Sequence, residues 1–159
     1  MTLTIRAATV ADAKAMSRIL RDVLVSWNSP RPFAPDHVTA HYITHPDGLR
    51  CSVAVDAAGD ILGFQSLKRA TEGNPFDLPD GYGIIGSYVD ASATGQGVGR
   101  ALFAASLAAA QAAGLAKIDA TIADSNAAGL AYYAAMGFRT YRQLPGAIGK
   151  VYVLDPPAA

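Results

Sequence analysis

The sequence has little that would build a covalent or a charged scaffold. Cys51 is the only cysteine among 159 residues, so no disulfide can form within the chain. Such a chain suits a reducing compartment, and we expect it to act in the cytoplasm. Lys and Arg together number 13, as do Asp and Glu, which gives a net charge of zero. This balance argues against electrostatic capture of nucleic acid and against a polybasic membrane arm.

A long apolar run is also missing. The stretch that comes nearest, residues 101–116, is interrupted by Ser106, Gln111 and Gly114 and is too short to span a bilayer. The first residues alternate between polar and apolar, unlike a secretion signal. Hydrophobic residues make up 51% of the chain, which suffices for a packed core at this length. We therefore expect one domain over residues 1–159 and no membrane partner.

Hydrophobic periodicity and turn residues predict a mixed α/β fold. Strands are expected at residues 3–7, 51–55, 61–67, 82–89, 117–123, 138–142 and 150–154. Helices are expected at residues 10–25, 36–44, 98–113 and 126–136. Residues 144–149 are interpreted as a loop. Strands that alternate with helices, together with a hairpin, indicate a helix-covered mixed sheet.

The most informative stretch is residues 89–100. Gly95, Gly97 and Gly99 alternate there, between a predicted strand and a predicted helix. Glycine lets the backbone turn tightly and approach a ligand closely. The first turn of the following helix offers N–H groups without intrahelical partners and the positive end of the helix dipole. The stretch therefore predicts a site for a phosphate-bearing cofactor.

Other interpretations of this loop were weighed. A plain connecting turn needs no ligand. A nucleotide triphosphatase loop requires Gly-Lys-Ser/Thr, and the residues here are Gly99, Arg100 and Ala101. A dinucleotide fingerprint requires glycine or alanine where Arg100 stands, although Asp119 lies near the distance expected for its ribose-binding acid. The dinucleotide interpretation remains a minor alternative.

Two motifs resemble the GNAT superfamily of N-acetyltransferases. The run from Thr94 to Gly99 (TGQGVG) resembles its acyl-CoA-binding pattern Q/R-x-x-G-x-G/A, with Thr94 in place of Gln or Arg. Later, Asn126 opens a helix in which Tyr133 lies four residues before the pair Gly137-Phe138, as in a second motif of that family. The resemblance spans nearly the whole chain.

The resemblance implies a fold and a cofactor. The fold is α/β (α+β): a GNAT-like mixed, mostly antiparallel central sheet flanked by helices, in which residues 82–89 and 117–123 form two splayed parallel strands around the CoA cleft. Acetyl-CoA is the implied co-substrate. The cofactor-binding residues that it implies are Tyr88, Val89, Thr94, Gly95, Gln96, Gly97, Val98, Gly99, Arg100, Ala101 and Asn126. The backbone of Tyr88 and Val89 would bond the pantetheine, and amides from Gly97 to Ala101 the pyrophosphate. Arg100 adds a charge or is simply solvated, and Asn126 also suits a helix N-cap.

The resemblance also implies a reaction. An acetyl group passes from acetyl-CoA to a primary amine, by direct attack through a tetrahedral intermediate. Tyr133 is the predicted acid for the departing thiolate, since a phenol with a pKa of about 10 stays protonated at neutral pH. Tyr132 points elsewhere on the helix and is expected to pack. For the base, the candidates are Glu72, the single Glu of the chain, and Asp90; otherwise the proton leaves through water.

The acceptor is expected to be a small-molecule amine. His37, His41 and His45 recur every four residues, but no carboxylate or thiolate joins them at helical spacing, so no metal is expected. We interpret them as a solvent-facing stripe or, as the resemblance implies, a wall of the acceptor site. Trp27, Pro30, Phe33 and Tyr42 would give that site an aromatic character, and packing in the core is an equal alternative for each of them. The resemblance leaves room for a homodimer. The alternative function, suggested by Thr94 and the absence of an obvious base, is a non-catalytic acyl-CoA-binding or sensing domain.

Overall fold

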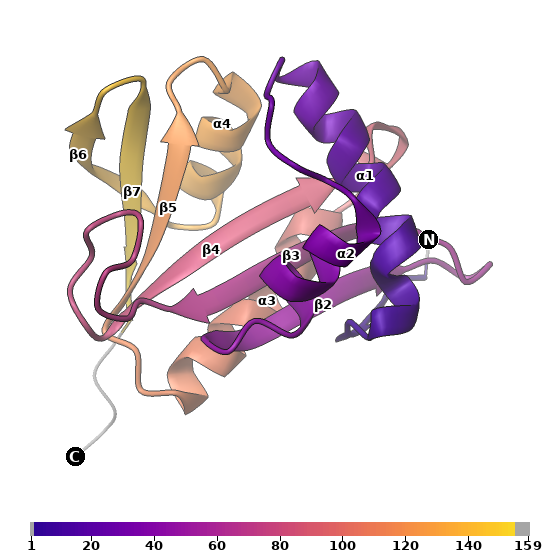
Figure 1. Cartoon of the computed structure of the whole chain (residues 1–159), viewed down its shortest axis with the longest axis horizontal. Helices are drawn as coiled ribbons and strands as arrows, with labels where there is room; N and C mark the ends of the chain where they lie inside the picture. Colours follow the sequence, from indigo (N-terminus) through magenta and orange to yellow (C-terminus); the bar gives the residue numbers. More distant parts are fainter. Residues whose placement is uncertain (1, 155–159) are drawn as a thin grey trace.

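One seven-stranded sheet runs through residues 2–154, which are the residues that the computed structural model describes (Figure 1). Its strands are β1 (Thr4–Ala7), β2 (Gly48–Val55), β3 (Ile61–Arg69), β4 (Tyr82–Val89), β5 (Lys117–Ala123), β6 (Arg139–Leu144) and β7 (Ala147–Val153). They lie in the order β1-β2-β3-β4-β5-β7-β6. The pair β4–β5 is parallel and the other neighbours are antiparallel. The predicted mixed, mostly antiparallel sheet is confirmed.

The two parallel strands are joined only at their beginnings. Tyr82, Gly83 and Ile84 pair with Lys117, Ile118 and Asp119, and no later residues of β4 and β5 pair. Beyond Ile84 the strands diverge (Figure 1). Gly83 keeps the joined end tight, because a Cβ there would lie 2.8 Å from Leu115 and 2.9 Å from Leu67. The second half of β4 therefore has a sheet partner on one side only, which is the predicted splay.

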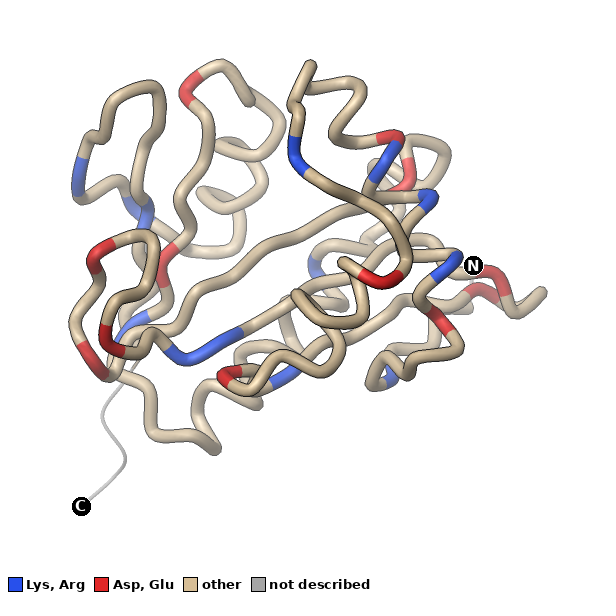
Figure 2. Tube along the Cα trace, viewed as in Figure 1, with Lys and Arg blue, Asp and Glu red and all other residues tan. Residues whose placement is uncertain are grey.

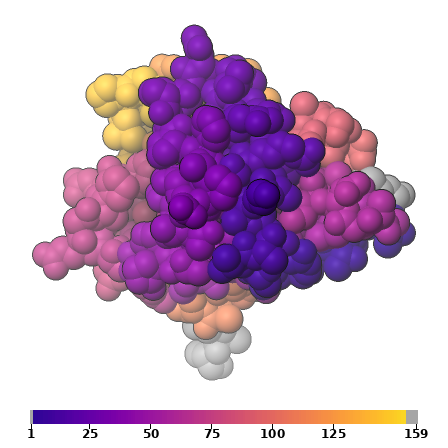
Figure 3. Space-filling model, turned by 45° about the vertical axis from the view of Figure 1, so that its right-hand side comes forward, coloured from indigo at the N-terminus to yellow at the C-terminus, as the bar shows by residue number. Residues whose placement is uncertain are grey.

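Helices cover both faces of the sheet. They are α1 (Ala13–Ser26), α2 (Pro35–Val38), α3 (Val98–Ala112) and α4 (Ala127–Ala135). One face is covered by α1 and α2 and the other by α3 (Figure 1). In the space-filling view the N-terminal part of the chain forms one continuous surface over the front (Figure 3). Met16, Leu20 and Phe64 are fully buried beneath it.

Most element bounds follow the sequence prediction, although β2 begins earlier, at Gly48, and β3 ends later, at Arg69, than expected. Other differences are larger. The helix expected at 10–25 opens with a 3-10 turn, Val10–Asp12, before α1. The helix expected at 36–44 divides into α2 and a π-helical turn, Thr39–Ile43. The predicted loop at 144–149 is wrong: β6 runs to Leu144 and β7 begins at Ala147, because Gly146 takes a left-handed conformation (φ 74°) that closes a tight hairpin turn.

The minor dinucleotide interpretation is also wrong. Strands upstream of the glycine loop are antiparallel rather than parallel. Asp119, its proposed ribose ligand, is fully buried in β5 and bonds to Thr121 and Tyr141. Within residues 2–154 no helix has the length and apolar character needed to cross a bilayer.

Asp12 joins β1 to the beginning of α1. Arg6 donates to both of its carboxylate oxygens, at 2.8 and 2.9 Å, and the Thr9 amide donates to Oδ2 at 2.8 Å. These bonds, the one from Arg6 first, hold the pKa of Asp12 below its usual value. A lowered folded-state pKa gives stability that is present above the unfolded pKa of about 4 and is lost as the pH falls through the folded value.

Asp12→Asn is therefore expected to lower the free energy of unfolding by about 1–2 kcal/mol at pH 7. The loss should be smaller near pH 3, where the wild-type carboxylate begins to protonate. Urea denaturation at both pH values measures the difference. The control is Asp22→Asn, which removes an exposed carboxylate paired with Arg21. Equal losses for the two variants would contradict the role given to Asp12.

Candidate functional site

A cavity of about 1250 Å³ lies beside the splayed half of β4. Its walls come from β4, the glycine loop, α4, and the segment that follows α1. Most of the predicted site residues line it: Glu72, Tyr88, Val89, Asp90, Thr94, Gly95, Gly97, Val98, Gly99, Arg100, Asn126 and Tyr133. Gln96 and Ala101 do not. The fold thus brings residues from distant parts of the sequence to one cavity.

The glycine loop presents unpaired amides at the beginning of α3. Gly97 is the N-cap of this helix and has a left-handed backbone (φ 80°). The backbone N–H groups of Gly97, Val98, Gly99 and Arg100 donate no hydrogen bond to any residue between 2 and 154. A Cβ added at Gly95 or Gly97 would meet no heavy atom within 4 Å, so the space before the loop is open. Open space beside four free donors and a helix N-terminus fits a diphosphate.

Two of the predicted cofactor contacts are used within the loop itself. The Ala101 amide already donates to the Gly97 carbonyl at 3.1 Å. The Gln96 amide donates to the Ala93 carbonyl at 3.3 Å, and its side chain to the Ser92 carbonyl at 3.2 Å. We therefore leave Ala101 and Gln96 out of the cofactor site that we propose below.

The edge of β4 exposes alternate backbone groups. The Asp90 amide donates to Leu62 of the β3 side, and the Tyr82 carbonyl accepts from Ala70 on that same side. Since backbone direction alternates along a strand, even-numbered residues of β4 face β3, and Ser87 and Val89 face the splay. The backbone groups of Val89 therefore have no strand partner on the splay side, where the predicted pantetheine contact lies. The backbone groups of Tyr88 face β3, so this residue reaches the cavity with its side chain and not with its backbone, which differs from the expectation.

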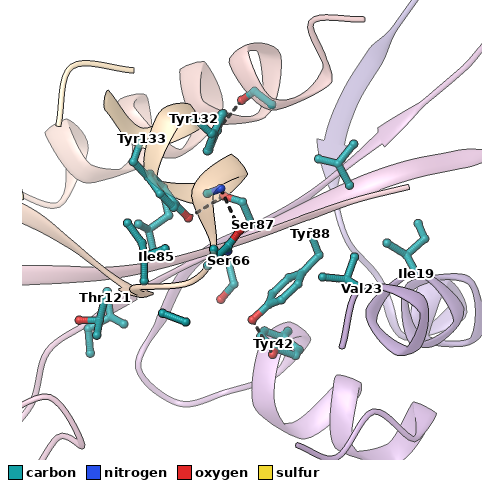
Figure 4. A pocket seen from close by; sticks show the side chains of 18 of the residues that line it. Ile19, Val23, Tyr42, Ser66, Ile85, Ser87, Tyr88, Thr121, Tyr132 and Tyr133 are labelled. Atoms are coloured by element: carbon teal, nitrogen blue, oxygen red, sulfur yellow. Dashed lines mark hydrogen bonds between the residues drawn. The ribbon is translucent and has the colours of Figure 1, made fainter. Parts of the chain in front are cut away.

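The neighbouring tyrosines of α4 have different partners. Tyr132 donates to the Gly99 carbonyl at 2.8 Å and contacts Gln65 Nε2 at 2.9 Å. Because a carbonyl only accepts, the hydroxyl hydrogen of Tyr132 is used, and Gln65 must be the donor to Tyr132. The same Gln65 nitrogen donates to Ser87 Oγ at 2.7 Å. Ser87 Oγ lies 3.0 Å from the Tyr133 hydroxyl, and either of the two oxygens can be the donor of this hydrogen bond (Figure 4).

This series of hydrogen bonds connects the glycine loop to Tyr133. The expectation that Tyr132 only packs is incomplete, since its hydroxyl links the first turn of α3 to Gln65. Burial is the main cause that raises the pKa of Tyr133, and the hydrogen bond with Ser87 acts in the opposite direction. Tyr133 therefore stays protonated at neutral pH.

The opposite end of the cavity carries aromatic and basic side chains. Tyr42 and Tyr88 point toward one another, with hydroxyl oxygens 3.3 Å apart (Figure 4). Arg31 donates to both hydroxyls, and Lys68 lies beside the Tyr42 ring. Trp27 also lines the cavity, whereas Pro30 and Phe33, expected there from the sequence, do not.

Two of the three histidines, His41 and His45, line the cavity, whereas His37 does not. The ring centres of His37 and His41 lie 4.9 Å apart in a stacked arrangement. Burial first, and the charge of Lys68 second, lower the pKa of His41 to about 4, so this ring is neutral at pH 7. No cluster of metal-ligating side chains forms in the described part of the chain.

Comparison with known proteins decides the family. Residues 16–138 match the family model described as the acetyltransferase (GNAT) family. The chain belongs to the GNAT acetyltransferases. No match was found among curated proteins.

Solved GNAT structures share the fold. A GCN5-related N-acetyltransferase from Kribbella flavida is 24% identical, with a TM-score of 0.79 over 96% of this chain and 98% of that one. A proposed acetyltransferase from Salmonella typhimurium, yncA, solved with its cofactor acetyl-CoA, is 23% identical, with a TM-score of 0.81 over 100% and 98%. An N-acetyltransferase from Thermoplasma acidophilum in complex with coenzyme A is 14% identical, with a TM-score of 0.77 over 97% and 100%. These likenesses confirm the predicted GNAT-like fold.

The candidate bases differ in their surroundings within this GNAT fold. Asp90 caps the 3-10 turn Ala91–Ala93 and accepts from the amide and hydroxyl of Ser92, at 3.0 and 2.9 Å. These bonds hold the pKa of Asp90 below its usual value, which makes it a weaker base. Glu72 is exposed and lines the cavity from the loop between β3 and β4.

Asn126 has the structural role that was expected. Its side chain accepts from the Gly129 amide at 3.0 Å and caps α4. It also lines the cavity, so the predicted cofactor contact stays compatible with the cap. Sequence reasoning missed Gln65, Ser87, Arg31 and Lys68 as members of the site. The sequence offered one signal for them: Gln65 and Lys68 are polar residues in a strand whose other residues are mostly buried.

Proposed function

We propose that this GNAT enzyme transfers an acetyl group from acetyl-CoA to the primary amine of a small molecule by direct attack. One observation carries the proposal: the free amides of residues 97–100 and the Tyr133 hydroxyl belong to the same cavity. The amides bind the diphosphate, and the backbone of Val89 holds the pantetheine arm along the edge of β4. Acetyl-CoA supplies the thioester carbonyl that the amine attacks.

Tyr133 provides the proton for the departing sulfur. Its hydroxyl is kept protonated by burial and lies 3.0 Å from Ser87 Oγ. When Ser87 donates to the phenol oxygen, the Tyr133 hydrogen is free to point into the cavity. The same donation stabilises the phenolate that remains after proton transfer. Gln65 donates to one acceptor site of Ser87 Oγ and leaves the Ser87 hydrogen available, so Ser87 is able to donate to the phenol oxygen.

The reaction also requires that the amine lose a proton. We propose Glu72, directly or through water, as the group that receives it. Asp90 stays a weaker candidate, since its lowered pKa and its bonds to Ser92 oppose protonation. We also propose that the protein acts in the cytoplasm as one domain. Gel filtration measures whether it is a monomer or a homodimer.

Melting with CoA and thiol release with amines test the proposal together. CoA at about 100 times its Kd is expected to raise the melting temperature by about 5 °C or more, because it binds only the folded chain. Acetyl-CoA with a panel of primary amines is expected to release thiol in an amine-dependent manner. NAD serves as the control ligand and should leave the melting temperature unchanged.

The outcomes separate the candidate functions. Stabilisation by CoA without amine-dependent thiol release would indicate the acyl-CoA-binding module instead of the enzyme. No stabilisation by CoA would refute the cofactor site.

A further inference from the structure

Arg31 lies at the cavity with unused hydrogen-bond donors. Its Nη2 donates to Tyr88 Oη at 2.9 Å and to Tyr42 Oη at 3.1 Å. Its guanidinium carbon lies 5.9 Å from the centre of the Tyr88 ring. Nε and Nη1 donate no hydrogen bond to any described residue, and no carboxylate pairs with this side chain between residues 2 and 154. The two tyrosines therefore hold the guanidinium group of Arg31 in place and leave its Nε and Nη1 hydrogens free to donate.

Lys68 brings a second cation to the same place. Its Nζ lies 5.5 Å from the centre of the Tyr42 ring. Burial is the first cause that lowers the pKa of Lys68, and the charge of Arg31 lowers it further, so the two cations act on each other. Among the described residues Lys68 has no ion pair. Arg31, which is exposed, and Lys68, which is half-buried, both contact Tyr42 and make no ion pair among the described residues, so they leave a positive field at this end of the cavity.

The acids around the cavity do not cancel this field by contact. Asp22 pairs with Arg21, and Asp90 caps the 3-10 turn with Ser92. Glu72, the proposed base, also lines the cavity but makes no ion pair with Arg31 or Lys68. Asp47 accepts from Thr71 and acts on Lys68 only at longer range. His41, whose pKa both cations lower, carries no charge at pH 7. The trace in Figure 2 shows basic positions along the sheet and acidic ones gathered mainly in the outer loops.

We propose that the acceptor is an amine that also carries a carboxylate, as an α-amino acid does, and that Arg31 and Lys68 bind this carboxylate. The proposal rests on the acetyl transfer proposed above and narrows its substrate class. Both hydrogens of Arg31 Nη2 are given to the tyrosines, so Nη1 and Nε remain as single donors, each able to reach one carboxylate oxygen. Lys68, beside the Tyr42 ring, adds a point charge. A polyamine would bring further positive charge to two cations and would be repelled.

Matched acceptors test the charge requirement. The probes are the standard L-α-amino acids, each compared with its own α-amide, with spermidine as a carboxylate-free amine. For the amino acids that are acetylated, kcat/KM is expected to exceed that of the amide by about 10-fold or more, as for loss of a charge-assisted contact. The amine of an α-amide deprotonates more readily, so amine basicity would favour the opposite order.

Substitutions locate the effect. Arg31→Met and Lys68→Met are each expected to reduce the acid-to-amide ratio by about 5- to 10-fold, mainly through KM for the acid. The matched controls are Arg21→Met and Lys14→Met, which remove exposed cations that do not line the cavity. They should leave the ratio unchanged.

A binding measurement works without turnover. Trp27 is the only tryptophan, lines the cavity, and has its ring centre 6.1 Å from that of Tyr88, so its fluorescence reports on ligands at this end. Titrations with acid and amide, with and without CoA, are expected to give the lower Kd for the acid in the wild type but not in Lys68→Met.

The results distinguish the two proposals. Equal Kd and equal kcat/KM for acids and amides, or no binding of any acid, would overturn the carboxylate site. Preferential binding of acids without amine-dependent thiol release would support the carboxylate site and refute the transferase function.

Discussion

Replacing Tyr133 with phenylalanine is expected to lower kcat by about 100-fold or more, the usual scale for loss of a positioned acid. The Kd for CoA should change by less than about 2-fold, because the ring keeps its contacts with Phe138 at 5.1 Å and Tyr132 at 4.8 Å, and no cofactor contact is assigned to the hydroxyl. Pre-steady-state acetyl transfer and CoA titration measure the two effects separately.

Tyr132→Phe is the matched control on the neighbouring position. It removes a hydroxyl that bonds Gly99 and Gln65, so we expect a weaker hold on the loop, seen mainly as a higher Kd for CoA. Ser87→Ala is expected to lower kcat less than Tyr133→Phe does, because the phenol remains and only its stabilising donor is lost. A Tyr133→Phe enzyme with the wild-type kcat would remove Tyr133 from the mechanism, whatever the effect of Tyr132→Phe.

The parts of the site that could be predicted are those written in a short stretch of sequence. The spacing of Gly95, Gly97 and Gly99 describes a turn into a helix, and the structure has that turn with α3 beginning at Val98. The position of Tyr133 before Gly137 and Phe138 likewise fixes one side of one helix. Local patterns of this kind survive folding because neighbouring residues set their own backbone geometry.

The parts that could not be predicted depend on contacts between distant residues. Gln65 meets Tyr132 across 67 positions, and Arg31 meets Tyr88 across 57. No spacing rule connects such pairs, since the order of strands in the sheet decides which of them meet. Arg31 also lies in a loop, between Pro30 and Pro32, whose direction is set by packing over the sheet rather than by its own sequence.

The difference between the predicted and the available cofactor contacts in the glycine loop has a similar cause. Gln96 and Ala101 belong to the motif by sequence, but their amides are bonded within the chain. A motif shows which residues are near a ligand. It does not show which N–H groups the helix has already used, because that depends on where the first intrahelical bond forms.

Arg100 allows the backbone donor and the side chain to be tested separately. Arg100→Ala removes the guanidinium and is expected to raise the Kd for CoA by about 3-fold, with a dependence on salt, as for an exposed charge. Arg100→Pro removes the guanidinium and the amide hydrogen together, and we expect a rise of about 10- to 100-fold, the cost of losing a hydrogen bond to a charged group. The ratio of the two values isolates the contribution of one amide.

Proline is suited to position 100 because no described residue accepts a hydrogen bond from the Arg100 amide. Arg100 is in the first turn of α3, its N–H donates to no described residue, and proline is tolerated in a first turn. The melting temperature without CoA should therefore match that of Arg100→Ala. Ala101→Pro is the contrasting variant, because it removes the bond to the Gly97 carbonyl and should lower the melting temperature. If Arg100→Pro bound CoA as tightly as Arg100→Ala, the free amides would not be the diphosphate site, and the cofactor would have to be held elsewhere in the cavity.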